Sequence, residues 1–234
     1  RVHSFRSYNS PLRIVFEINI INNLLADRIR NFTMKKNLSS NEKEILEMYH
    51  QIKPDIEKRI SEFKKIWDQA DNNTIFAELV FCLFTPQSSA RQCWRAVNIL
   101  LEKNLLFDGD WSQISSEINM VRFRNNKARY LVEAREKFIC SGDGVRGCLD
   151  LQAGDFEKRE WLVKNVKGMS YKEASHFMRN NGMGEKLAIL DRHILKNMKL
   201  LGVIDDIPRS INRKVYLELE QKLADYSKCI GIPM

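Results

Sequence analysis

Proline, glycine and paired cysteines are all scarce in this sequence. Five prolines and ten glycines in 234 residues are too few for the many tight turns of a β-sandwich or barrel, so they favour long helices. The five cysteines are odd in number and include no C-x-x-C pair, which argues against a disulfide framework, a zinc ribbon and an iron–sulfur cluster. We therefore expect reduced thiols in an intracellular, cytoplasmic protein.

Long apolar runs are missing as well. No stretch reaches the roughly 18 apolar residues that a membrane-spanning helix needs. Residues 13–25, RIVFEINIINNLL, come nearest to a secretory signal core, but Glu17 and three asparagines interrupt them. Met34 opens MKKNLSSNEKE in the manner of a natural start. We therefore interpret residues 1–33 as an N-terminal extension without an assigned role and residues 34–234 as the functional domain.

The charge is strongly of one sign. The formal net charge is +8 and the pI is about 9.2. Such a balance favours a polyanionic partner, either nucleic acid or an acidic membrane surface, and carries no information about the fold.

The apolar residues recur with the period of helices. Ile45, Tyr49 and Ile52 are spaced by four and three, and Pro54 is expected to break the helix that they begin. Residues 74–84, TIFAELVFCLF, are apolar nearly all round, which predicts a buried helix that ends at Thr85-Pro86. A further helix is expected to begin after Ser88 or Ser89, and another runs from about Asn125 to a loop at 141–148. Helices are also expected over residues 156–166, over residues 171–181, from the residue after Asp191, and over residues 210–226. Since no period of two persists, the expected fold class is all-α.

Two of these helices are joined by a short glycine turn, residues 166–170, which makes a helix-hairpin-helix over about 156–181. Gly168 permits a positive φ, and the following helix presents free N–H groups to a phosphate oxygen. Ser170 and Glu173 have the S-x-x-E spacing of a capping box, so the second helix should begin at Tyr171. The alternative is an ordinary helix connection with solvated lysines.

The hairpin region is rich in basic residues. Residues 161–199 contain eight lysines and arginines against three acidic residues. The basic residues are Lys164, Lys167, Lys172, Arg179, Lys186, Arg192, Lys196 and Lys199. Such a turn and patch suit sequence-independent contact with the DNA backbone.

Lys172 is expected at the second position of the hairpin's second helix. The positive pole of the helix disfavours an ammonium group there, and a lysine amine attacks carbon only when it is neutral. Lys172 is therefore a candidate nucleophile, with a solvated surface lysine as the alternative. Asp191 should cap the next helix, which fixes a carboxylate that can stabilise a developing cation; a purely structural cap is the alternative.

At these residues the sequence resembles the helix-hairpin-helix DNA glycosylases with a catalytic lysine. The closer resemblance is to the archaeal and bacterial 8-oxoguanine DNA glycosylase/lyases of the second type. It is carried by VKGMSYKEASHFM, LAILDRHIL, the E-L-x-F-C segment 78–82 and the block 126–129, and it covers about residues 42–234. The implied fold has two helical lobes with the active site in the cleft between them.

The resemblance implies a role for several residues. Lys172 would be the nucleophile and Asp191 the catalytic carboxylate. Lys167, Gly168 and Ser170 would hold a phosphate, with a monovalent cation on the hairpin carbonyls and no other cofactor. Gln87 would fill the gap left by the extruded base, unless it is simply a polar residue at a helix start. His193 and Arg192 would contact the DNA backbone, although a structural role suits His193 equally well.

Two features depart from the family's pattern. Ser170 replaces the usual second glycine of the hairpin, and the sequence ends at GIPM without the aromatic-rich segment and terminal lysine of the relatives. We interpret that ending as truncation or disorder, and the residues that read the damaged base are left unassigned.

The expected activity is excision of 8-oxoguanine from duplex DNA by a monomer, through a lysine Schiff base and β-elimination. Because N7 is a donor in 8-oxoguanine and an acceptor in guanine, one buried acceptor would discriminate between them. Two alternatives remain: a glycosylase/lyase for another oxidised base, and a non-catalytic hairpin module that only binds DNA.

Overall fold

The computed structural model describes residues 38–140 and 142–234, and every regular element in that part of the chain is a helix, which confirms the predicted all-α class. The extension predicted for residues 1–33 lies outside the described residues. The elements are α2 (Leu38–Gln69), α3 (Asn72–Phe84), α4 (Ala90–Glu102), α5 (Leu105–Asp108), α6 (Trp111–Glu117), α7 (Arg124–Arg135), a π-helical turn (Glu136–Cys140), α8 (Gly144–Asp150), α9 (Asp155–Asn165), α10 (Tyr171–Asn180), α11 (Arg192–Leu200) and α12 (Arg213–Ile230).

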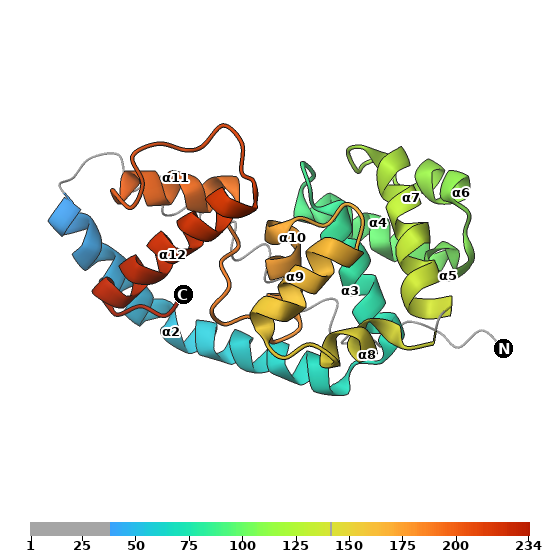
Figure 1. The fold of residues 1–234 in the computed structure, drawn as a ribbon, viewed down its shortest axis with the longest axis horizontal. Helices are drawn as coiled ribbons and strands as arrows, with labels where there is room; N and C mark the ends of the chain where they lie inside the picture. Colours follow the sequence, from blue (N-terminus) through green and yellow to red (C-terminus); the bar gives the residue numbers. More distant parts are fainter. Residues whose placement is uncertain (1–37, 141) are drawn as a thin grey trace.

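The helices form two groups with the hairpin between them (Figure 1). Helices α11 and α12 lie at one end of the molecule and α4 to α7 lie at the other. Helices α3, α9 and α10 occupy the middle, and the long α2 runs along one side from α12 towards α3. The hairpin made by α9 and α10 therefore stands where the two groups meet.

The larger hydrophobic core is built around α3. Residues 75–84 are all buried in the folded chain, as expected for a helix that is apolar nearly all round. The helix begins after Asp71, whose side chain accepts a hydrogen bond from the Thr74 N–H, and Thr85 follows its last turn. Helices α4, α7, α8 and α10 pack around it.

A second, smaller core joins α11 and α12 to the start of the hairpin's second helix. Its buried members are Tyr171, Ala188, Leu190, Leu195, Met198, Ile204, Tyr216 and Leu219. Helix α10 contributes Tyr171 to this core and Ala174 and Phe177 to the larger one. One short helix thus borders both cores, and its first turn lies at their junction.

The expected break at Pro54 is wrong, because α2 continues through it. A proline inside a helix removes one hydrogen bond, here to the carbonyl four residues earlier, at His50. Both residues are exposed, so water can hydrate the freed carbonyl and the helix persists.

The segment expected as a loop over 141–148 is also partly wrong, since α8 begins at Gly144. Val145 and Leu149 are four residues apart and fully buried, so they share one face against the core. Their burial outweighs the roughly 1 kcal/mol by which each glycine weakens a helix.

Candidate active site

The hairpin turn has the conformation that its glycine predicts. Gly168 has a φ of 85°, and the Met169 N–H donates to the Val166 carbonyl at 3.2 Å. A Cβ atom at Gly168 would lie 2.2 Å from a ring carbon of Tyr130, so α7 packs directly against the turn. Glycine is therefore needed for both the backbone conformation and the space.

The second hairpin helix begins at Tyr171, as predicted, and Ser170 and Glu173 form the expected capping box. The Glu173 carboxylate accepts hydrogen bonds from the Ser170 hydroxyl and, at 3.3 Å, from the Ser170 N–H. Ser170, which stands where the family's second hairpin glycine is expected, thus fixes the start of α10.

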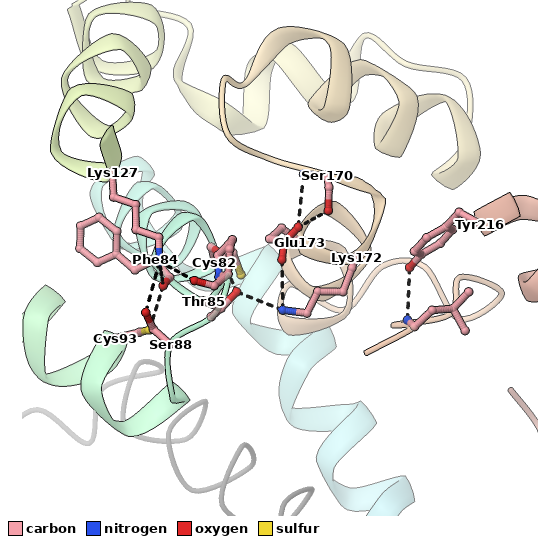
Figure 2. Close-up of polar contacts among 12 residues, drawn as sticks. Cys82, Phe84, Thr85, Ser88, Cys93, Lys127, Ser170, Lys172, Glu173 and Tyr216 are labelled. Atoms are coloured by element: carbon pink, nitrogen blue, oxygen red, sulfur yellow. Dashed lines mark hydrogen bonds and ion pairs between the residues drawn. The ribbon is translucent and has the colours of Figure 1, made fainter. Parts of the chain in front are cut away.

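Lys172 is the second residue of α10 and points towards the end of α3 (Figure 2). Its side chain is 24% exposed, and its Nζ lies 3.1 Å from Glu173 Oε1 and 3.3 Å from the Thr85 hydroxyl oxygen. The amine lies at the N-terminal end of α10 and beside the buried Glu173 carboxylate. The amine is therefore partly accessible and held between two elements, next to a group that can accept its proton.

Asp191 caps α11, as predicted. Its Oδ1 accepts hydrogen bonds from the N–H groups of His193 at 2.8 Å and Ile194 at 2.9 Å. Both capping hydrogen bonds go to the same carboxylate oxygen. The position is fixed by the cap, which is what a preorganised carboxylate requires.

The segment before Asp191 is anchored to α12. The Tyr216 hydroxyl donates to the Ala188 carbonyl at 2.7 Å and accepts from the Leu190 N–H at 3.3 Å. Burial raises the pKa of Tyr216 to about 12, which keeps the phenol protonated as a donor. Glu220 accepts a further hydrogen bond from the Ala188 N–H at 2.8 Å. The backbone that leads to Asp191 is therefore held at three points.

The same glutamate connects this segment to the hairpin. Arg159 of α9 and Glu220 form a buried, bidentate ion pair with N–O distances of 2.5 and 2.7 Å. The guanidinium lies 5.4 and 5.7 Å from the ring centroids of Tyr171 and Tyr216, and the two rings also pack against each other. One buried network thus supports both the helix that carries Lys172 and the segment that carries Asp191.

Asp191 also lies within electrostatic reach of α10. Arg179 lies in the last turn of α10, and burial lowers its pKa. The negative charge of Asp191 is close enough to raise that pKa and so to counteract part of the shift. The nucleophile candidate and the carboxylate candidate are thus carried by neighbouring elements around the hairpin.

Gln87 is exposed on the turn that follows α3 and has a φ of 55°. Helix α4 begins at Ala90 with Ser89 as its cap, so Gln87 lies two residues before that cap. A non-glycine residue with positive φ is strained and often marks a functional position. The contact with DNA that the resemblance implies stays a prediction.

Phe123, which the sequence analysis did not single out, lies on the neighbouring loop. It is 52% exposed with a φ of 59°, and the Arg122 N–H donates to the Ser88 hydroxyl oxygen at 2.9 Å. The available signal was an aromatic residue between two arginines, R-F-R at 122–124, in a stretch without helical periodicity.

The predicted backbone-contact residues differ in their surroundings. Lys167 is 63% exposed and forms an ion pair with Glu133 at 2.8 Å, which raises the pKa of the lysine. Such an exposed pair is weak and can be exchanged for a phosphate contact. Arg192 is exposed in the first turn of α11, and His193 beside it is partly buried. Their roles at DNA remain predictions.

A group of buried polar residues lies where α3 packs against α10, and it was not predicted from the sequence. Glu78 Oε1 accepts from the Asn180 amide at 2.6 Å, and burial raises the pKa of Glu78 to about 7. Burial likewise lowers the pKa of His176 well below its ordinary value, which keeps the imidazole neutral. The E-L-x-F-C segment of α3 therefore packs against α10 and is hydrogen-bonded to it through Glu78.

Within the described residues, no helix combines the length and apolar character needed to cross a bilayer.

Known proteins resemble this chain along most of its length. A family model described as 8-oxoguanine DNA glycosylase matches residues 56–232. A Fusobacterium nucleatum protein named 8-oxoguanine DNA glycosylase/AP lyase is 46% identical over 202 residues, which cover 86% of this chain and 92% of that protein. A Thermotoga maritima protein of the same name is 35% identical over 199 residues, or 81% and 88% of the two chains.

Solved structures agree with the sequence comparison. The Methanocaldococcus jannaschii 8-oxoguanine glycosylase/lyase, in complex with a 15mer DNA containing 8-oxoguanine, superposes with a TM-score of 0.73 at 31% identity, covering 83% of this chain and 91% of that one. The 8-oxoguanine DNA glycosylase of Thermotoga maritima gives a TM-score of 0.72 at 30% identity, covering 84% and 91%.

Proposed function

The chain belongs to the 8-oxoguanine DNA glycosylase family, and from this we propose that it excises 8-oxoguanine from duplex DNA and then cleaves the strand as a lyase. The observation that carries the proposal is the place of Lys172, on the first turn of the hairpin helix and between Thr85 and Glu173.

The first chemical step is proposed for the Lys172 amine. After the damaged nucleotide has been extruded from the duplex, the neutral amine attacks C1′ of the sugar and the bond to the base breaks. The ammonium proton must leave first, and the Glu173 carboxylate at 3.1 Å is placed to accept it. Asp191 stabilises the positive charge that develops on the sugar.

The second step is cleavage of the strand. Opening of the sugar ring gives a protonated imine between C1′ and the lysine nitrogen. The imine acidifies the C2′ proton, whose removal expels the phosphate on the 3′ side by β-elimination. The lysine is released when water hydrolyses the imine, so the amine is regenerated.

DNA binding is proposed for the surface around these two residues. Gln87 would enter the gap left by the extruded base, while Lys167, Gly168 and Ser170 at the hairpin, with Arg192 and His193 on α11, would contact phosphates. The net charge of +8 supports such a partner.

A monovalent cation on the carbonyls of the hairpin turn would tie that turn to a phosphate; no other cofactor is needed. We propose a monomer that acts on DNA inside the cell.

A panel of lesions tests this proposal. Duplexes that carry a single 8-oxoguanine, thymine glycol or uracil are incubated with the protein, and base release and strand cleavage are measured separately. We expect both activities on 8-oxoguanine. Preference for thymine glycol would instead indicate a glycosylase for another oxidised base, and binding without cleavage of any duplex would indicate a non-catalytic module.

A further inference from the structure

The turn after α3 lies between two lysines, Lys172 on one side and Lys127 of α7 on the other (Figure 2). Lys127 is only 3% exposed. Its Nζ donates to the carbonyls of Phe84 at 2.6 Å and Pro86 at 2.7 Å, and lies 3.3 Å from the Ser88 hydroxyl oxygen. These three acceptors use all three N–H bonds of an ammonium group.

A charged lysine is an unfavourable choice for this position if packing is its only role. The three acceptors are neutral, and although the last turn of α3 favours a positive charge at the Phe84 carbonyl, the N-terminus of α7 opposes one. Burial lowers the pKa of Lys127 to about 8. An apolar side chain of the same length would fill the space without the cost of burying a charge. The role of this lysine therefore lies in its hydrogen bonds.

Capping of α3 explains only part of the arrangement. The Phe84 carbonyl belongs to the last turn of α3 and needs a partner, but the Cys93 thiol already donates to it at 3.1 Å. Pro86 and Ser88 lie beyond the helix. The contacts of Lys127 therefore extend across the whole turn.

That turn holds a strained residue. The Ser88 N–H donates to the Thr85 carbonyl at 3.1 Å, which closes a four-residue turn with Pro86 and Gln87 at its centre. Gln87 has a φ of 55°, a value that favours glycine or asparagine, and its side chain is exposed. A strained conformation persists only where the surroundings hold it, and Lys127 contacts the residues on both sides of Gln87.

We propose that Lys127 is a positioning residue for base excision, which holds the 85–88 turn so that Gln87 stays in the conformation from which it enters the DNA. The inference rests on the proposed function. Because Thr85 at the start of this turn contacts Lys172 Nζ, the same hydrogen bonds also keep the inserting turn in register with the nucleophile.

A double-mutant cycle tests whether Lys127 acts through Gln87. Single-turnover excision of 8-oxoguanine is measured for the wild type, Lys127→Met, Gln87→Ala and the double variant. Each protein is present at a concentration that saturates the DNA, and the assay temperature is below the unfolding temperature of every variant. Each single variant should lose roughly 10-fold to 100-fold in rate, as expected for a misplaced contact. The double variant should be no slower than the slower single variant, because both changes remove one interaction.

Control variants separate positioning from general destabilisation. Lys103→Met removes an exposed ammonium just after α4 and should leave the rate unchanged. If Lys127→Met is unfolded at the assay temperature, Ser88→Ala replaces it in the cycle, since it removes one of the three acceptors and keeps the charge. An unchanged rate in Lys127→Met, or losses that multiply in the double variant, would overturn the inference. A wild type inactive on 8-oxoguanine would instead remove the proposed function and this inference with it.

Discussion

At the scale of single residues, the site residues that could be placed from the sequence are those marked by nearby residues, such as a helix cap. Lys172 and Asp191 lie at helix starts that Ser170 and Asp191 themselves specify, so spacing predicted their places in the fold, while the resemblance supplied their proposed roles. Lys127 and Glu78 gave no such signal. Their burial depends on groups 43 and 102 residues away in the chain, at Phe84 and Asn180, and only the folded structure brings these together.

Asp191→Asn separates the charge of this residue from its capping role. Asparagine caps helices as well as aspartate, so the fold and DNA affinity should persist. Loss of the charge should slow single-turnover excision by roughly 10²-fold or more, because the cationic sugar loses its electrostatic partner. Asp71→Asn, which changes the cap of α3 in the same way, is the matched control and should keep the wild-type rate. Near-normal turnover of Asp191→Asn would remove this carboxylate from the mechanism.

Glu78 should make stability depend on pH. Its pKa is about 7 in the folded protein and about 4.5 when unperturbed, so between these values the folded state keeps a proton that the unfolded state has released. The free energy of unfolding therefore decreases as pH rises from 4.5 to 7, by roughly 1 kcal/mol per pH unit from this group, and levels off above pH 7.

Urea unfolding between pH 5 and pH 8 measures this effect. In Glu78→Gln the slope below pH 7 should be shallower than in the wild type by that amount. Glu218→Gln changes an exposed carboxylate of α12 and should keep the wild-type slope. Identical slopes in Glu78→Gln and the wild type would show that Glu78 is ionised throughout.

At the scale of elements, the hairpin was predictable and parts of its surroundings were not. Its glycine, cap and basic residues are contiguous in sequence, and the helix starts at the predicted Tyr171. The continuity of α2 through Pro54 and the helix beginning at Gly144 were missed, since proline and glycine are unfavourable in helices. Exposure of Pro54 in the first case and burial of Val145 and Leu149 in the second account for the outcome, and neither can be read from local propensity.

Gly168→Ala should disrupt the hairpin turn. The added Cβ meets the Tyr130 ring at 2.2 Å and the φ of 85° is strained for alanine, so we expect a loss of about 1–3 kcal/mol in the free energy of unfolding and weaker DNA binding. Thermal unfolding and binding to an undamaged duplex measure the two effects.

Gly142→Ala is the matched control for Gly168→Ala. Gly142 has a φ of 87°, but its Cβ would meet nothing within 4 Å, so it carries the strain without the clash. It should be less destabilising and should leave DNA binding intact. If the two variants lose the same stability, close packing of α7 against the turn is not the reason for the glycine at 168.

At the scale of the whole molecule, two hydrophobic cores meet at the first turn of α10, and the Arg159–Glu220 pair connects the hairpin to α12 across that junction. Breaking such a buried pair by removing one partner is strongly destabilising. The arrangement therefore couples the backbone that carries Asp191 to the hairpin that carries Lys172. Hydrophobic periodicity predicted the helices, but the pairing of Arg159 with a residue 61 positions later was beyond it.

Covalent trapping with borohydride on a duplex containing 8-oxoguanine examines the role of Lys172 itself, because reduction converts the imine between protein and sugar into a stable bond. The wild type should give a protein–DNA adduct, and so should Lys222→Gln, which alters an exposed lysine of α12. Lys172→Gln should bind the same duplex and give no adduct. An adduct of wild-type yield in Lys172→Gln would show that another amine performs the reaction.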